Sequence, residues 1–384
     1  MNLPISLLVF DQTGSTLASA LIMICGMLPD VILPIFVAPL IDRTSKRSWI
    51  VGLDLALAVV YVLMGWWISS HPFSFGLYLI FTLVVAMISV FYQLAYSSWY
   101  PDLIPVGAEQ QGYAVSGTMY PVITVVMAPV AAILYEKVPM HQIFYVVAGL
   151  VLVSVAIEGS IRNIGTKKTD SYTLAQYKTD LLEGFRYLKR EKGVRNICLN
   201  SAVGNGTSNA VGVLSQAFFQ TSSLLTVTMF GLLSSAEMIG RTIGGLIQYR
   251  VQIPVKKRFA FTKFVYTFYT FMDGCLLFLP YPAMLVNRFL CGILGVSSAT
   301  IRAAAMNCYL APDIRARVNA LCNVLYALGG IALHLGAGLM GQVMDYLLAS
   351  LIVSGVCMAA IIGFIVIPGR VNRPVYEATR EETA

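Results

Sequence analysis

Several ionisable residues lie inside long apolar stretches of this chain, where a charge needs a physical reason. Asp30 stands in one of them, residues 16–40, between Pro29 and Pro34. A charged side chain in hydrocarbon costs about 2.5–3.5 kcal/mol on insertion scales, so it is a functional candidate by default. The prolines free backbone carbonyls and can open the helix toward water, which would solvate Asp30. The alternative is a carboxyl group that only hydrogen-bonds a neighbouring helix.

Glu237 and Arg241 are four residues apart, so on a helix they share a face and can neutralise each other. In a functional role, Glu237 would be a protonatable acid that releases Arg241 when a proton or substrate arrives. In a structural role, the pair would only make membrane insertion less costly. The spacing fits both.

The segment 200–209 is too polar and too rich in glycine to face lipid, and it contains Asn200, Asn205 and Asn209. Close packing through small residues would explain its glycines. It would not explain three asparagines, so we expect this segment to line a cavity near mid-membrane.

Three further polar residues stand alone in apolar runs: Asp273, His334 and Arg302. A histidine titrates near neutral pH and could relay protons, but a single buried one often only makes a hydrogen bond. Both possibilities stay open for Asp273 and His334. Arg302 is about two turns from a predicted inner helix end, so we expect its side chain to reach the lipid headgroups.

The composition indicates an all-α, polytopic membrane protein. Hydrophobic residues make up 57% and charged residues 12% of the chain, against about 45–50% and about 25% in soluble domains. The net charge of +7 is spread over short Lys/Arg clusters between apolar runs, which excludes nucleic acid as the expected partner. The seven cysteines lie in apolar runs without Cys-x-x-C spacing, so neither disulfides nor a metal site are expected.

Apolar runs long enough to cross a bilayer predict 11 complete spans after a short stub at 3–10. They are 16–40, 49–69, 74–96, 113–135, 142–161, 194–219, 225–249, 259–279, 283–309, 317–340 and 346–368. With 41–48 placed in the cytoplasm, every Lys and Arg except Lys137 and Arg288 falls in an inside loop or nearer the inner end of a span. The positive-inside rule therefore fixes the orientation.

Local matches between the two halves indicate an internal duplication of six spans. Residues 100–104 match 311–315, and 46–47 match 257–258, both at an offset of 211, whereas 12–13 match 220–221 at 208. The duplication predicts a bundle at 1–161, a linker with an amphipathic surface helix at 162–193, a bundle at 194–368 and a cytoplasmic tail at 369–384. About a dozen residues of the first crossing would then be missing. The alternative is an 11-span protein.

This organisation resembles the major facilitator superfamily, whose G-x-L-x-D-R-x-x-R-K loop is partly matched by Asp42-Arg43 and Lys46-Arg47, with Ala38 in place of the glycine. Residues 128–134 and 181–188 are similar to segments of the macrolide-efflux branch of drug exporters. Two features depart from that pattern: the span 74–96 lacks the arginine of many proton-driven members, and Ala128, Ala131 and Ala132 replace exporter glycines.

The resemblance implies a cytoplasmic gate built from charged residues at the inner helix ends, although membrane topology alone would also explain its Lys and Arg residues. The gate candidates are Asp42, Arg43, Lys46, Arg47, Asp54, Lys257, Arg258 and Arg317. The cavity candidates are Asp30, Asn200, Asn205, Asn209, Glu237, Arg241, Asp273 and His334.

The resemblance also implies a secondary transporter in the cytoplasmic membrane, working by alternating access. We expect it to export small amphipathic compounds in exchange for protons, as a monomer surrounded by lipid. No enzyme motif is present, and no cofactor or metal is expected. The alternatives are an importer or facilitator of a small polar solute, and a non-transporting receptor or scaffold.

Overall fold

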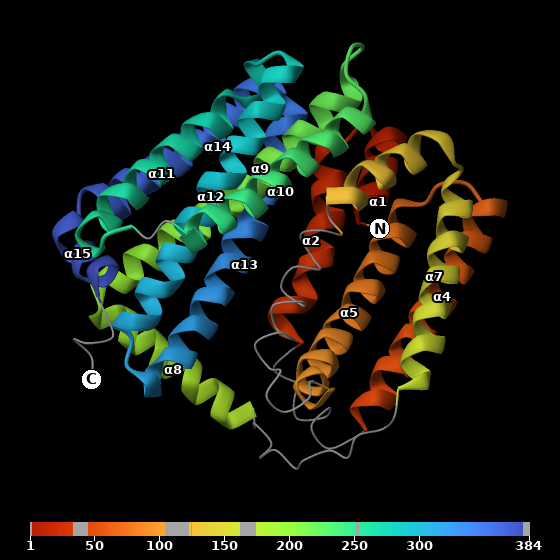
Figure 1. The fold of residues 1–384 in the computed structure, drawn as a ribbon. Coiled ribbons are helices and arrows are strands. Elements are labelled where there is room, and N and C mark those ends of the chain that lie inside the picture. The colour runs from red at the N-terminus through yellow and green to blue at the C-terminus, as the bar shows by residue number, and fades with distance from the viewer. Residues whose placement is uncertain are drawn as a thin grey trace. The chain divides into compact units, whose positions relative to one another are not determined.

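The computed structural model describes residues 2–33, 45–103, 123, 125–161, 174–250 and 253–378, and within these ranges the chain is helical without strands (Figure 1). This confirms the predicted all-α class. The described residues form two compact units. The predicted bundle and linker limits remain a prediction.

The first unit is built on a pair of long helices, α4 (Lys46–Ser70) and α7 (Met140–Ser160), which pack lengthwise against each other (Figure 1). Gly65 permits the close approach, since a Cβ there would lie 3.2 Å from the carbonyl oxygen of His141. The ring of Phe144 on α7 lies 5.2 Å from that of Phe81, on α5, between ring centroids. The unit also contains α1 (Asn2–Thr13), most of α2 (Thr16–Ile32) and α5 (Phe75–Leu103).

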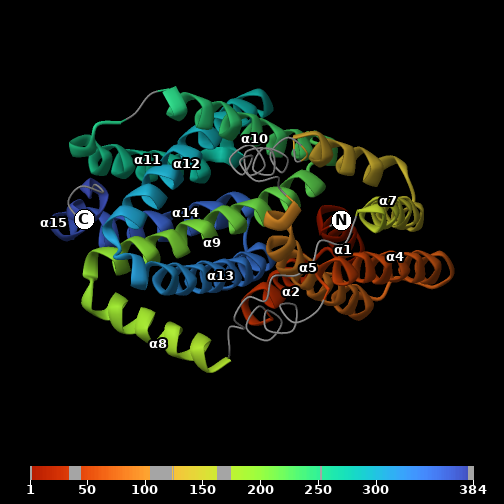
Figure 2. The ribbon, with the colours of Figure 1, turned by 60° about the horizontal axis from the view of Figure 1, so that its bottom comes forward.

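The second unit surrounds one central helix, α9 (Lys192–Thr221), most of whose side chains are buried. Helix α9 lies between α13 (Pro312–Val343) and α14 (Tyr346–Ala360) (Figure 2). Gly206 and Gly329 let α9 and α13 touch, because a Cβ on Gly206 would overlap the Gly329 carbonyl. The remaining helices are α8 (Leu174–Arg190), α10 (Val227–Arg250), α11 (Val255–Cys275), α12 (Tyr281–Tyr309) and α15 (Gly369–Glu377), with the short turns η1 (Leu276–Phe278) and η2 (Ile361–Val366).

Among the described residues, six helices are long and apolar enough to cross a membrane. They are Lys46–Ser70, Phe75–Tyr96, Met140–Ser160, Tyr281–Met306, Leu321–Val343 and Tyr346–Val366, all within a few residues of predicted spans. Large apolar side chains such as Leu150, Ile157 and Leu246 are exposed, as expected of surfaces that face lipid. The chain is therefore a multi-pass membrane protein.

The tail predicted after residue 368 begins with a packed helix, α15. Its Asn372 is buried and accepts a hydrogen bond from Asn196 Nδ2 on α9 at 3.2 Å. Asn372 also donates to the carbonyl oxygen of Phe364 at 2.7 Å. Tyr376 is fully buried, and its hydroxyl lies 3.2 Å from that of Tyr266 on α11. Helix α15 thus belongs to the core of the second unit.

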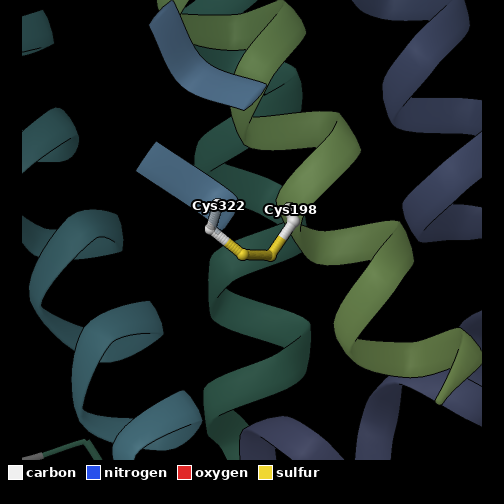
Figure 3. Close-up of a disulfide and its surroundings, with 2 residues drawn as sticks. All are labelled: Cys198 and Cys322. Atoms are coloured by element: carbon white, nitrogen blue, oxygen red, sulfur yellow. A yellow bond between two sulfur atoms is a disulfide. The ribbon is translucent and has the colours of Figure 1, made fainter. Parts of the chain in front are cut away.

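Cys198 on α9 and Cys322 on α13 form a disulfide, with their Cα atoms 5.6 Å apart (Figure 3). The sequence prediction that no cysteine would pair is wrong at these two positions. Residues 124 apart in the sequence meet here because their helices run in contact along the Gly206–Gly329 side. Cys25, Cys275, Cys291, Cys308 and Cys357 are free thiols.

Candidate functional site

The second unit encloses a polar cavity of about 430 Å³. Its walls come from α9, α10, α11 and α12, together with Cys357 of α14 and Ile361 at the start of η2. A volume of this size is sufficient for a small-molecule ligand. The lining residues with polar side chains are Asn200, Ser201, Asn205, Thr207, Ser208, Asn209, Glu237, Arg241, Tyr266, Tyr269, Thr270, Asp273, Arg288, Ser298 and Arg302.

The three asparagines of α9 line this cavity, and their role in binding a substrate remains a prediction. Asn205 and Asn209 are one turn apart and share a face of α9, whereas Asn200 lines the cavity from another side of the helix. Asn205 is exposed and donates from Nδ2 to the carbonyl oxygen of Tyr326 at 3.3 Å. Asn200 is buried, and its Oδ1 accepts no hydrogen bond in the described part of the chain. Helix α9 therefore offers amide groups to a ligand or to water in the cavity.

A chain of ion pairs crosses the cavity. Arg288 Nη2 lies 2.6 Å from Asp273 Oδ1, and Arg288 Nη1 lies 3.7 Å from Glu237 Oε2. The other oxygen of Glu237 accepts hydrogen bonds from Arg241 Nη2 at 3.0 Å and Nε at 3.2 Å. Glu237 is thus shared by two arginines, and the Glu237–Arg241 pair predicted from the sequence is part of a larger network.

Two features of the helices bring these charges together. Asp273 on α11 and Arg288 on α12 lie at similar distances from the turn at Leu279–Pro280, so the hairpin places them side by side. On α12, Gly292 follows Arg288 by one turn and sits against the backbone of Glu237 and Arg241. This contact draws α10 close enough for Glu237 to reach Arg288.

The ion-pair network of Asp273, Arg288, Glu237 and Arg241 is partly buried, and some of its polar atoms make no hydrogen bond to a residue that the structure describes. The side chain of Asp273 is 1% exposed and that of Arg288 is 10% exposed, whereas Arg241 is 45% exposed. Within the described residues, Asp273 Oδ2 and Arg288 Nε have no hydrogen-bond partner. These atoms leave room for a ligand or water to join the network.

Asp30 and His334 are not among the residues that line this cavity. Asp30 is exposed near the end of α2. His334 is buried on α13, and its Nδ1 lies 3.1 Å from the carbonyl oxygen of Gly330. His334 is therefore a buried, hydrogen-bonded residue of α13, and a role in proton transfer remains a prediction.

The predicted gate is only partly described. Asp42, Arg43 and the side chain of Arg317 lie outside the described residues. Arg47 Nη2 donates to the carbonyl oxygen of Gly159, which ties the start of α4 to the end of α7.

Asp54 is buried on α4. Glu158 accepts a hydrogen bond from the Tyr92 hydroxyl at 2.8 Å. Lys46 is buried at the start of α4. Lys257 and Arg258 lie in the first turn of α11, and no acidic partner is found for them among the described residues. A gating role for these residues remains a prediction.

Sequence reasoning missed the parts that Arg288, Arg302, Tyr266 and Tyr269 play in the cavity. Arg288 was visible only as an exception to the positive-inside rule. Its position opposite Asp273 across a short turn was a signal that could have identified the pair. Arg302 does not reach toward headgroups as predicted, because its guanidinium lies 6.0 Å from the ring centroid of Tyr326 and lines the cavity.

A comparison with protein-family profiles identifies one family for this chain. The profile described as Major Facilitator Superfamily matches residues 1–272. No curated protein sequence matches the chain. The fold is similar to the nucleoside transporter NupG, with a TM-score of 0.64, 12% identity, and coverage of 95% of this chain and 96% of that one.

A bacterial homologue of the human lysosomal transporter Spinster, in an inward-facing and occupied conformation, has a similar fold. Its TM-score is 0.58 at 12% identity, with coverage of 96% of this chain and 97% of that one. At these identities the similarity shows the fold alone.

Proposed function

Because the chain belongs to the Major Facilitator Superfamily, we propose that it is a secondary transporter that moves a small polar solute by alternating access. The family and the fold of its structural neighbours are those of transporters rather than enzymes. The solute would bind in the cavity of the second unit, against the asparagines of α9 and the ion-pair network of α10, α11 and α12.

The observation that carries this proposal is the polarity of the cavity wall. Its ligand-facing groups are amides, hydroxyls and paired charges, with few aliphatic side chains. Sites for amphipathic drugs are lined predominantly by hydrophobic and aromatic side chains, with a small number of polar groups. An amphipathic compound would leave many of these polar groups without partners, which lowers its affinity.

Glu237 is the part of the network that we expect to respond to the solute. It is shared between Arg241 and Arg288, and its side chain is 24% exposed. A solute hydroxyl or a proton that engages Glu237 would weaken both ion pairs together. Binding would thereby change the contacts between α10 and α12, and coupling to protons would act through the same carboxyl group.

A second candidate is export of small amphipathic compounds in exchange for protons. It is favoured by the similarity of residues 128–134 and 181–188 to macrolide exporters and by the protonatable acids of the cavity. The two candidates differ in substrate polarity and in the direction of transport relative to the proton gradient.

Counterflow in proteoliposomes would separate them. Vesicles containing the purified protein are loaded with unlabelled uridine, glucose or erythromycin, and entry of the labelled compound is followed with and without an imposed pH gradient. The nucleoside is included because one structural neighbour is a nucleoside transporter. We expect exchange of a polar compound and none of erythromycin.

The variant Asn205→Leu should reduce this exchange about tenfold, as expected when an amide hydrogen bond to the solute is lost. The control Thr242→Leu, on the exposed side of α10 and outside the cavity, should leave it unchanged. Erythromycin movement against protons would instead support the second candidate. Binding of a polar compound without any exchange would identify a receptor and contradict both.

A further inference from the structure

The charged residues of the cavity do not balance. Among the described residues, its wall contains the cations Arg241, Arg288 and Arg302 and the acids Glu237 and Asp273. The two acids are engaged by Arg241 and Arg288. One positive charge, that of Arg302, is left over inside the bundle.

Arg302 is held by groups that carry no negative charge at neutral pH. Its Nη1 donates to the Tyr266 hydroxyl at 3.5 Å, and its guanidinium faces the ring of Tyr326 at 6.0 Å from the centroid. No carboxylate lies within ion-pair distance of it in the part of the chain that the structure describes. The aromatic contacts orient the guanidinium plane and leave most of its five N–H donors for another partner.

The neighbouring wall fits such a partner. Ser298 lies one turn before Arg302 on the same face of α12 and also lines the cavity. Asn200, on the facing helix α9, brings an amide group to the same space. A planar guanidinium beside hydroxyl and amide groups matches the geometry of a carboxylate or phosphate.

We infer that the transported solute carries an anionic group, a carboxylate or a phosphate, and that Arg302 binds it. This inference rests on the proposed function and adds the chemical class of the solute. The anion supplies the charge that the wall lacks, and the polar network of Glu237, Arg288 and Asp273 contacts the rest of the molecule. An anionic lipid headgroup has the same chemistry, so the test must separate the two sources.

Binding is measured on the full-length protein in nanodiscs of phosphatidylcholine, which carry no anionic lipid. The probes are inorganic phosphate and two matched pairs, uridine 5′-monophosphate with uridine and glucose 6-phosphate with glucose. We expect an anionic member to bind at least about tenfold more tightly than its neutral partner, because a hydrogen bond to a charged group is worth more than a neutral one.

The variant Arg302→Gln should remove this preference and leave binding of the neutral partner within about twofold. Arg302→Lys keeps the positive charge but lacks the planar guanidinium, so it should retain part of the preference for the anionic probe. Arg190→Gln, an equal charge change on the exposed end of α8, should have no effect. If Arg302→Gln does not fold, Tyr326→Leu replaces it and should weaken anion binding, whereas Tyr326→Phe keeps the ring and should not.

The inference is overturned if no anionic probe binds the wild type better than Arg302→Gln or Tyr326→Leu does. It is also overturned if only added phosphatidylglycerol stabilises the wild type in an Arg302-dependent way, since Arg302 then binds lipid. Failure of the proposed function would look different: anions would bind through Arg302, yet proteoliposomes would exchange neither the anionic probes nor their neutral partners.

Discussion

Asp273 is the more buried of the two acids that line the described part of the cavity, and Arg288 is the cation that compensates its charge. Its carboxylate pairs with Arg288 at 2.6 Å, and the side chain is 1% exposed. Removing one member of a buried pair leaves an uncompensated charge, which costs about 3–5 kcal/mol, whereas removing both is often nearly neutral. The pair is therefore needed as a unit for folding, whatever it contributes to transport.

Asp273→Asn should lower the free energy of unfolding by about 3–5 kcal/mol, and the double variant Asp273→Asn/Arg288→Gln should recover most of that loss. Thermal unfolding in detergent measures both. Arg373→Gln removes an exposed pair with Glu377 and should change stability by about 0.5 kcal/mol or less. A double variant as unstable as the single one would show that an uncompensated Arg288 charge is not the cause of the loss.

Single residues could be predicted where the surrounding sequence decided their environment. Polar groups in apolar helices avoid lipid, and on that ground the sequence selected five residues that line the cavity: Asn200, Asn205, Asn209, Glu237 and Asp273. Asp30 and His334 were selected by the same rule, yet neither lines the cavity. The rule shows that a residue must turn away from lipid, but it does not show which interior surface the residue then faces.

At the scale of helices, α10 and α12 pack through glycines that leave no room for a side chain. A Cβ on Gly292 would overlap the carbonyl oxygen of Glu237 and would lie 2.8 Å from the amide nitrogen of Arg241. This contact is what allows Glu237 to approach Arg288. The packing of the helices and the chemistry of the site therefore depend on the same position.

Gly292→Ala should destabilise the protein by about 1–3 kcal/mol, because the two backbones must separate. It should also weaken solute binding, since Glu237 moves away from Arg288. The matched control is Gly245→Ala, also in this helix pair, where an added Cβ meets no atom within 4 Å and stability should not fall. Thermal unfolding of both variants would check this, and equal effects would contradict the assigned contact.

The positions of helices were predictable to within a few residues, but contacts between them were not. Apolar runs bounded by charges located six membrane helices close to their observed limits. The Cys198–Cys322 disulfide was missed because cysteine spacing along the sequence carries no information on the packing of α9 against α13. The sequence after residue 368 has no long apolar run. It therefore gave no reason to expect that Tyr376 would be buried.

At the scale of the whole molecule, the distribution of charge predicts which side of the membrane each loop occupies. Helix α8, with Lys189 and Arg190 in its last turn, is expected in the cytoplasm, and the connection after α9 outside. Only the fold could be inferred at this scale from the sequence resemblance. The solute class depended on contacts of Arg302 that no sequence pattern indicated.

This orientation can be tested with a membrane-impermeant maleimide on variants made in a cysteine-free background. Lys189→Cys should react only after the membrane is permeabilised, because α8 is predicted to face the cytoplasm. Ser223→Cys, exposed in the connection between α9 and α10, should react in intact cells. Reversed reactivity of the two sites would overturn the predicted topology.

The surplus positive charge at Arg302 also bears on how membrane voltage acts on the transport cycle. Each elementary charge that crosses the full electric field gains or loses about 2.3 kcal/mol per 100 mV. An empty cavity with one excess cation would be drawn toward the negative inner face, whereas a bound monoanion would cancel that pull. A negative inside potential would then slow the return of the empty cavity to the outer face. The transition of the solute-loaded protein would hardly depend on voltage.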